Sequence, residues 1–353
     1  MSNQQIKYKK KIYPISNPFF NYLKKHNRSV KMPISYFDLL RFNESMPVYD
    51  DAGDDTLWLR TYFTGEEREE IESGLKKVYS ILHVDGNDDI IPYLNIDAID
   101  FCTFGNTKPF RIKIRNILND NYVYLYVKQA DASRVYGLEL EEILSPNQVN
   151  FLVQGDTLIE EHIFGIPGDV FIQEHLQELS NIDKSSVAKE FVKFNERCFI
   201  RLLGDMRSYN YVVVKTHDFD RIQYRFRAID FDQQSYEGEY MIYFPHSFEE
   251  NQPLVKLVEE VLPKDSIEQY KREERALIAK RANSNKERLN ELVLCMIEDK
   301  ISLEKNVEKL KKYLYQLTKD VKFKRSNNMG EILNSSLDFV RRNYENINPY
   351  LIS

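Results

Sequence analysis

Cysteine is scarce in this chain of 353 residues, and its placement excludes two kinds of site. Cys102, Cys198 and Cys295 lie far apart and form no CxxC pair or Cys/His cluster. Neither a disulfide framework nor a structural zinc site is therefore expected. Buried free thiols in a reducing compartment fit this pattern better. The six histidines also lack the spacing that metal ligands require.

Long apolar runs are also missing, and no stretch reaches the roughly 18 apolar residues of a membrane-spanning helix. The opening lysines are followed by no apolar segment, so MSNQQIKYKKKIYPIS does not predict a secretory signal. We therefore expect a cytoplasmic protein with no membrane partner. The net charge of −6 argues against nucleic acid as a partner, because nucleic-acid binders are normally basic.

Apolar residues are plentiful enough for a sizeable core, at 42% of the chain with 13% aromatics. The length predicts two domains, or one domain of two lobes with an extension. Acidic residues are absent from residues 1–35, which hold eight lysines and arginines. We interpret residues 1–35 as a basic arm that docks loosely or contacts an acidic partner.

We expect residues 36–97 to form a helical segment ahead of the predicted strands, here called the helical preface. Thr64 could cap a helix over GEEREEIESGLKKVYSIL. Over much of residues 98–165 the apolar residues recur at every second position, which is the period of a β-strand. AIDFCTF, FRIKIRN and NYVYLYVKQA predict three strands, ASRVYGLELEEIL predicts a helix, and NFLVQ and TLIEEHIF predict two further strands. The order of this segment is three strands, a helix and two strands. Residues 166–353 read as mainly helical, with one hairpin inside residues 202–233 and charged, apolar-striped helices after about 265.

The hairpin carries the motif with chemical meaning. LLGDMRSYNYVVV (202–214) contains D-x-x-x-x-N, and YRFRAIDFDQ (224–233) contains I-D-F-D. Phosphoryl transfer from ATP needs oxygen ligands for Mg²⁺ and a carboxylate beside the attacking hydroxyl. Asp205 could accept the substrate proton, while Asn210 and Asp230, facing each other across the hairpin, could bind the metal. Turn capping is the alternative role for Asp205 and Asn210.

These two segments resemble the catalytic and metal-binding loops of the protein-kinase-like superfamily. They are most similar to its atypical branches, such as the aminoglycoside phosphotransferases and the HipA-type kinases. In those families the catalytic loop often has the sequence G-D-x-x-x-x-N, and the metal-binding loop often has the sequence I-D-F-x. The resemblance covers about residues 98–240. It implies an α+β, two-lobed fold with a small antiparallel N-lobe containing one helix, and a mainly helical C-lobe with the catalytic hairpin. Two positions depart from the pattern: Leu203 and Gly204 replace the usual His or Arg, and Asp232 replaces a glycine.

The resemblance also implies roles for residues upstream of the hairpin. Lys128 would pair the α- and β-phosphates of ATP and serve catalysis, held by Glu139 or Glu142 of the following helix. The GIPGD segment resembles the hinge that meets adenine, which gives Ile166 a role in binding the nucleotide. The turn before the second strand would cover the phosphates, although it has a single glycine; its residues are Gly105, Asn106, Thr107 and Lys108.

We therefore expect a phosphotransferase that uses ATP and Mg²⁺, with a protein hydroxyl or a small molecule as the acceptor. A pseudokinase that binds nucleotide or acts as a scaffold is one alternative, favoured by the poor glycine loop. A kinase-fold nucleotidyltransferase is another. The helices after residue 265 are expected to complete the helical lobe, because residues 166–210 supply too few helices to bury the hairpin.

Overall fold

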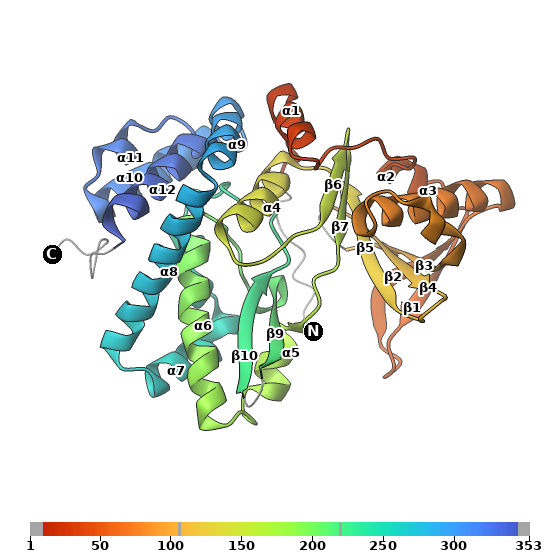
Figure 1. Ribbon diagram of the computed structural model, residues 1–353. Helices are drawn as coiled ribbons and strands as arrows, with labels where there is room; N and C mark the ends of the chain where they lie inside the picture. The colour runs from red at the N-terminus through yellow and green to blue at the C-terminus, as the bar shows by residue number, and fades with distance from the viewer. Residues whose placement is uncertain (1–9, 105–106, 219–220, 345–353) are drawn as a thin grey trace. The chain divides into compact units, whose positions relative to one another are not determined.

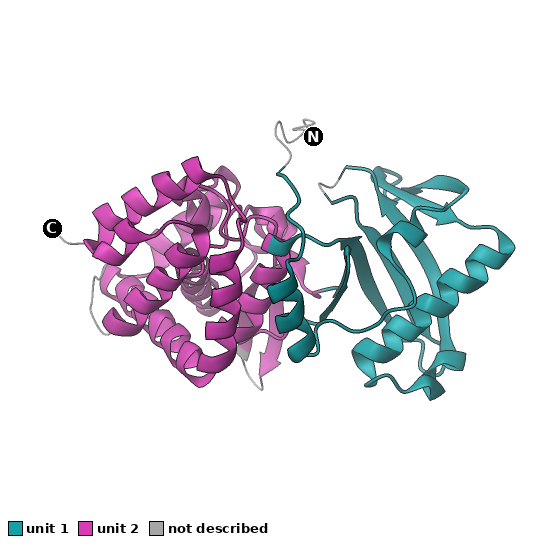
Figure 2. Ribbon diagram, turned by 90° about the horizontal axis from the view of Figure 1, so that it is seen from above, with its two compact units in different colours: residues 1–132, 149–162 teal, residues 133–148, 163–353 magenta. Residues whose placement is uncertain are grey.

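The computed structural model describes residues 10–104, 107–218 and 221–344, which fold into helices and antiparallel sheets (Figure 1). The chain divides into two compact units (Figure 2). Unit 1 comprises residues 1–132 and 149–162, and unit 2 comprises residues 133–148 and 163–353. The α+β class expected from the sequence is confirmed. In the part of the chain that the structure describes, no helix is long and apolar enough to cross a membrane.

The described part of unit 1 is built on a seven-stranded antiparallel sheet in the order β1-β2-β3-β4-β5-β7-β6. The order of three strands, a helix and two strands is present along the chain, because α4 (Ala132–Leu144), nearly all of which belongs to unit 2, separates β5 from β6. The strands are β1 (Glu44–Tyr49), β2 (Asp55–Tyr62), β3 (Leu94–Cys102), β4 (Phe110–Asn116), β5 (Tyr122–Gln129), β6 (Phe151–Gln154) and β7 (Thr157–Glu161).

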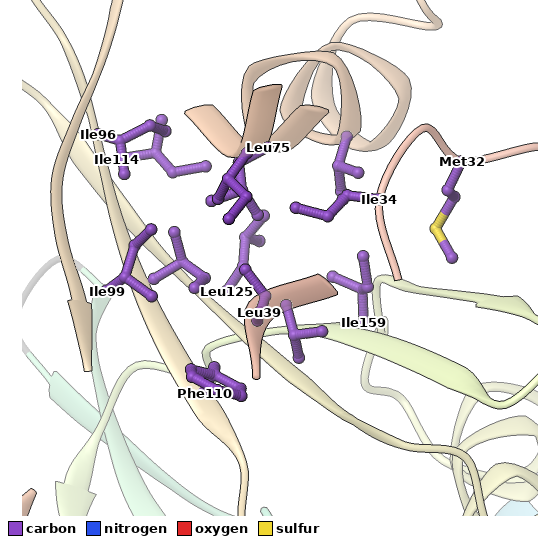
Figure 3. Close-up of a cluster of buried hydrophobic side chains, with 14 of the residues drawn as sticks. Met32, Ile34, Leu39, Leu75, Ile96, Ile99, Phe110, Ile114, Leu125 and Ile159 are labelled. Atoms are coloured by element: carbon purple, nitrogen blue, oxygen red, sulfur yellow. The ribbon is translucent and has the colours of Figure 1, made fainter. Parts of the chain in front are cut away.

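One face of this sheet forms the core of unit 1. In β4, Phe110, Ile112 and Ile114 are fully buried, while Arg111 and Lys113 between them point to the other face. The short helix α2 (Tyr36–Leu39) and the long helix α3 (Gly65–His83) supply apolar side chains to the same cluster. Figure 3 shows Leu39 and Leu75 directed toward the strands. The apolar residues that alternate along the strands and those at helical spacing in α3 thus pack together in one core.

The N-terminal arm is an integral part of unit 1 wherever the structure describes it, so the expectation of loose docking is wrong for residues 10–35. Helix α1 (Asn17–Lys25) begins at Ser16, whose hydroxyl accepts from the Phe19 amide at 3.3 Å. Phe19 and Leu23 are fully buried. Lys10 pairs with Asp131 inside the unit. The buried residues of α1 are Phe19, Tyr22 and Leu23, which lie three and four residues apart and form a narrow apolar face. The many lysines around this face made it hard to recognise from the sequence.

The helical preface expected over residues 36–97 is also only partly correct. Helix α3 is present, but β1 and β2 lie ahead of it and extend the sheet at the edge opposite β6. Their register pairs Glu44 with Tyr62 and Val48 with Trp58. The sequence DTLWLRTY contains Thr, Trp and Tyr, which favour strands, but it does not alternate apolar and polar residues, so the helical interpretation passed over it.

Unit 2 surrounds a smaller sheet, in the order β10-β9-β8, with helices. The predicted hairpin is present and consists of β9 (Tyr211–Asp218) and β10 (Arg221–Ala228). The third strand of this sheet, β8 (Ile166–Pro167), pairs with β9. The other helices are α5 (Gly168–Val170), α6 (Asn181–Ile200), α7 (Gln252–Val261), α8 (Lys264–Ser284), α9 (Lys286–Glu298), α10 (Glu304–Thr318), α11 (Val321–Arg325) and α12 (Met329–Asn343).

The C-terminal helices belong to unit 2 and pack against its earlier elements. Ser336 of α12 donates to the carbonyl oxygen of Ile200 at the end of α6, at 2.8 Å. Gly330 lies so close to α9 that an added Cβ would overlap the backbone of Met296 and Ile297. The helices after residue 265 therefore share a core with the segment that carries the hairpin.

Candidate functional site

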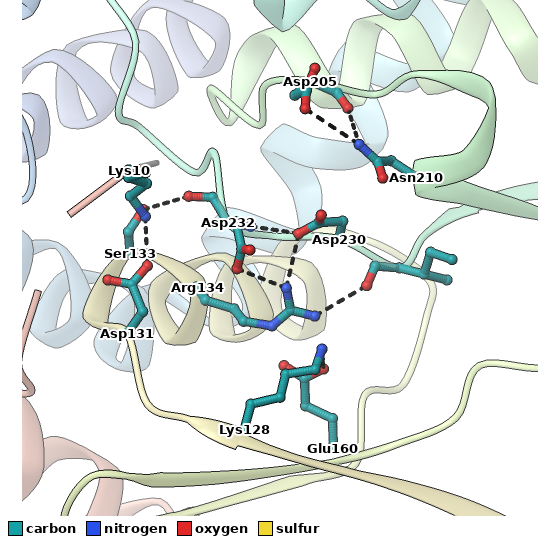
Figure 4. A network of polar contacts seen from close by, with 11 residues as sticks. Lys10, Lys128, Asp131, Ser133, Arg134, Glu160, Asp205, Asn210, Asp230 and Asp232 are labelled. Carbon is teal, nitrogen blue, oxygen red and sulfur yellow. Dashed lines mark hydrogen bonds and ion pairs between the residues drawn. The ribbon is translucent and has the colours of Figure 1, made fainter. Parts of the chain in front are cut away.

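The hairpin brings two of the predicted site residues together in unit 2. Tyr211 pairs with Ala228 at the ends of β9 and β10, and the Ile229 amide donates to the Asn210 carbonyl oxygen at 3.0 Å. Asp230, one residue further, therefore lies beside the start of β9. Asp205 lies on the loop that leads into this strand (Figure 4). The five-residue spacing of Asp205 and Asn210 places all three side chains at one end of the hairpin.

Asp205 occupies a tight, strained turn. Its φ of 61° is in the left-handed region, which costs a non-glycine residue about 1 kcal/mol. Its carbonyl oxygen accepts from the Arg207 amide at 2.8 Å and from Asn210 Nδ2 at 2.7 Å, and its amide donates to the Ile242 carbonyl at 3.0 Å. These bonds hold the strained backbone and fix the direction of the carboxylate. Such strain often marks a functional position.

The electrostatic surroundings of Asp205 suit a general base. Burial raises the pKa of its carboxyl to about 6; Arg207, whose Nε donates to Asp205 Oδ1 at 3.1 Å, opposes the rise, and the charge of Asp230 adds to it. A carboxylate with a pKa near the working pH is ionised at neutrality, yet it holds a proton more readily than an ordinary aspartate. Asp205 can therefore take up a proton from a hydroxyl group.

Asn210 is buried, and its side-chain amide is oriented by Asp205. Because Nδ2 donates to the Asp205 carbonyl oxygen, the amide oxygen is the atom of this side chain that suits a cation. Asp230 supplies a carboxylate that is 37% exposed. Oxygen donors of these two kinds are the ligands that Mg²⁺ prefers. Among the residues that the structure describes, no group of three or more His, Cys, Asp or Glu side chains could hold a metal ion.

Sequence reasoning missed an arginine at this site. Arg134 of α4 is buried, and its Nη1 lies 2.9 Å from Asp230 Oδ1 and 2.9 Å from Asp232 Oδ1. Its Nη2 also donates to the Ile229 carbonyl oxygen at 3.2 Å. A cation at Asp230 therefore shares that carboxylate with a guanidinium, and the two positive charges oppose each other. Arg134 is the single basic residue of the α4 sequence ASRVYGLELEEIL, and this isolation was the available signal.

Lys128 is held by a different residue from those expected. Its Nζ lies 2.8 Å from Glu160 Oε2, and both side chains are nearly buried in unit 1. Glu160 in β7 is opposite Tyr126, two residues from Lys128 in β5, so the pair is a diagonal contact between adjacent strands. Glu139, one of the two expected partners, is fully buried in unit 2 with both carboxylate oxygens bonded to Arg288. Glu142, the other expected partner, lies on the same helix of unit 2.

The remaining predicted positions are less informative. Gly105 and Asn106 lie outside the described residues. Thr107 is half-buried, and the Lys108 carbonyl oxygen accepts from the Tyr36 hydroxyl at 3.1 Å. Ile166 lies in β8 and pairs with Val213 of β9. Its backbone therefore contributes to the small sheet of unit 2.

Comparison with known proteins gives no family for this chain. No protein-family model matches it, and no curated protein matches it.

Proposed function

We propose that this protein is an ATP- and Mg²⁺-dependent phosphotransferase of kinase-like organisation, which acts on a hydroxyl group of a protein or a small molecule. The observation that carries the proposal is Asp205, with its raised pKa and strained turn, beside Asn210 and Asp230 at one end of the hairpin. The order of three strands, a helix and two strands ahead of the hairpin agrees with it.

Each side chain has a distinct part in this reaction. Asp205 accepts the proton of the acceptor hydroxyl. The hydroxyl oxygen forms a bond to the γ-phosphorus of ATP, and the bond between the γ-phosphorus and the bridging oxygen that leaves with ADP breaks. Asn210 and Asp230 would hold Mg²⁺, which supplies charge neutralisation to the phosphates. Lys128 would bind phosphate oxygens. Glu160 would hold the ammonium group of Lys128 in place through their ion pair.

A nucleotide-binding protein without turnover is a second candidate, and one observation favours it. Arg134 forms ion pairs with both Asp230 and Asp232. If this contact persists when nucleotide is bound, the guanidinium itself takes the place of a metal ion beside the phosphates. Both candidates thus use the same ATP site. The second candidate needs no Mg²⁺ and transfers no phosphate.

Thermal unfolding with ATP, with and without Mg²⁺, tests both candidates. The phosphotransferase predicts that ATP with Mg²⁺ raises the Tm, since a ligand that binds the folded state stabilises it. Asp230→Ala should abolish the Mg²⁺-dependent part, and Asp218→Ala, at the remote end of the same hairpin, should retain it. Equal shifts in both variants would exclude the metal role of Asp230. A rise that needs no Mg²⁺, with no loss of ATP over time, would favour the second candidate.

A further inference from the structure

A polar pocket in unit 2 lies between α6, α8 and the β9–β10 hairpin. Its volume is about 210 Å³, several times the space of one water molecule in the liquid. Four cationic side chains line it, and they outnumber its two carboxylates, Glu190 and Glu274, by two. The cations are Lys193, Arg197, Arg225 and Arg281. A cavity with this charge suits a dianion.

The residue spacing explains why these charges converge. On α6, Lys193 and Arg197 are four residues apart and therefore share a helix face. On α8, Glu274 and Arg281 are seven residues apart, which is two helical turns. Arg225 projects from β10, which packs beside α6. Three elements therefore direct basic side chains into one space.

The two α6 cations are already paired. Lys193 Nζ lies 2.9 Å from Glu273 Oε2, and Arg197 Nη1 lies 3.2 Å from Glu274 Oε1. The guanidinium groups of Arg225 and Arg281 are not paired: neither group forms a hydrogen bond or ion pair with any residue that the structure describes. The Nη1 atom of Arg281 is nevertheless buried. A buried guanidinium N–H without a protein acceptor is costly, and an anion bound in the pocket would satisfy it.

The electrostatics agree with this geometry. Burial lowers the pKa of Arg281, Glu274 opposes that effect, and the charges of Arg197 and Arg225 lower the pKa further. Arg281 thus experiences repulsion from two neighbouring guanidinium groups. A bound dianion would reverse it, and guanidinium groups match phosphate oxygens in geometry as well as in charge.

We propose that this pocket binds a phosphate group, with Arg281 as its central ligand and Arg225 at the exposed mouth. The site is separate from the candidate catalytic residues. Thr216 and Gln223, which also line it, pair six residues along the hairpin from Asn210, or about 20 Å in an extended strand. It therefore goes beyond the proposed transfer reaction and does not depend on it.

Isothermal titration calorimetry of the full chain at constant ionic strength tests the proposal, with inorganic phosphate, pyrophosphate and O-phosphoserine as separate probes. Wild type should bind at least one of them. Preference for O-phosphoserine would indicate a phosphorylated protein segment as the natural ligand, and preference for the inorganic anions would indicate a free phosphate compound. Both results support a phosphate site, whereas no binding of any probe would overturn it.

Two variants and a matched control locate the binding. Arg281→Ala and Arg225→Ala should each weaken phosphate affinity by about tenfold or more, because each removes a charge-assisted contact. Lys280→Ala removes the same charge from an exposed position next to Arg281 and should leave the affinity unchanged. Arg225 is exposed, so its variant remains informative if Arg281→Ala unfolds. Wild-type affinity in Arg225→Ala would refute the site. Asp230→Ala should bind phosphate normally, which separates this test from that of the proposed function.

Discussion

The guanidinium of Arg134 and the carboxylate of Asp230 form an ion pair, with Nη1 2.9 Å from Oδ1. The arginine side chain is 3% exposed and the aspartate side chain is 37% exposed. Asp232 contacts the same nitrogen at 2.9 Å. The buried cation thus holds two acidic side chains at the end of the hairpin, and any metal ion bound there competes with it for the same oxygens.

Replacing Arg134 should therefore make the site more responsive to Mg²⁺. We expect Arg134→Met to lower stability by about 2 kcal/mol, because Asp230 and the less exposed Asp232 both lose their cation. Mg²⁺ should restore part of this loss, and should raise the Tm of the variant more than that of wild type. Arg288→Met is the matched control: it removes an arginine from the buried Glu139, away from the hairpin. An equal Mg²⁺ response in both variants would show that Asp230 and Asp232 do not bind the ion.

Asp205 should impose a pH dependence on turnover and on stability. Its pKa is about 6 in the folded protein and about 3.9 in an unfolded chain, so the folded state binds the proton more tightly. The stabilisation it contributes is complete below about pH 4 and is lost as the pH rises through 6. Asp205→Asn should therefore gain about 1 kcal/mol relative to wild type between pH 4 and 7, a figure reduced for solvent screening.

The rate should show the opposite trend, since the ionised carboxylate is the base. Turnover of wild type should rise with pH through about 6 and then level off, and Asp205→Asn should lose most turnover while it retains ATP affinity. Urea denaturation and ATPase or transfer assays at several pH values measure the two effects. If Asp205→Asn turns over at the wild-type rate, Asp205 is not the base and its role is to form the turn.

The first described helix should be necessary for the stability of unit 1. Phe19→Ala empties a fully buried site on α1 and should cost about 3 kcal/mol. Phe20→Ala, at the adjacent and 36% exposed position, should cost about 0.5 kcal/mol or less. Urea denaturation compares the two variants. Similar small losses in both variants would support the interpretation of residues 1–35 as a loosely docked arm.

The sequence predicted local structure better than it predicted charge partners. Strands β4 and β5, helices α3 and α4, and the β9–β10 hairpin followed from periodicity, because each has a regular apolar face. Strands β1 and β2 were missed since their residues are mostly exposed, which weakens the alternation. The partners of Lys128 and Asp230 could not be found this way. Glu160 and Arg134 are distant from them in sequence, and only tertiary packing determines such pairs.

The close approach of α12 to α9 gives a test of the C-terminal helices. Gly330→Ala should destabilise the protein by about 2 kcal/mol, because the new methyl group meets the backbone of Met296 and Ile297, which cannot rotate away. Gly65→Ala at the start of α3 meets no atom and should be neutral or slightly stabilising. Thermal unfolding measures both. If Gly330→Ala leaves the stability unchanged, the α9–α12 contact is not part of the core of unit 2.

Lys128 offers a way to separate a structural role from nucleotide binding. Lys128→Met takes the cation away from Glu160, a carboxylate that is 6% exposed, and should cost about 3 kcal/mol. Adding Glu160→Gln neutralises the carboxylate, so the double variant should recover most of that stability. The proposed function predicts that the double variant folds but binds ATP with Mg²⁺ about tenfold more weakly than wild type, because a charged contact to phosphate is gone. Glu160→Gln alone keeps the lysine and should bind ATP within about threefold of wild type. Wild-type ATP affinity in a well-folded double variant would assign Lys128 to the stability of the β5–β7 pair alone.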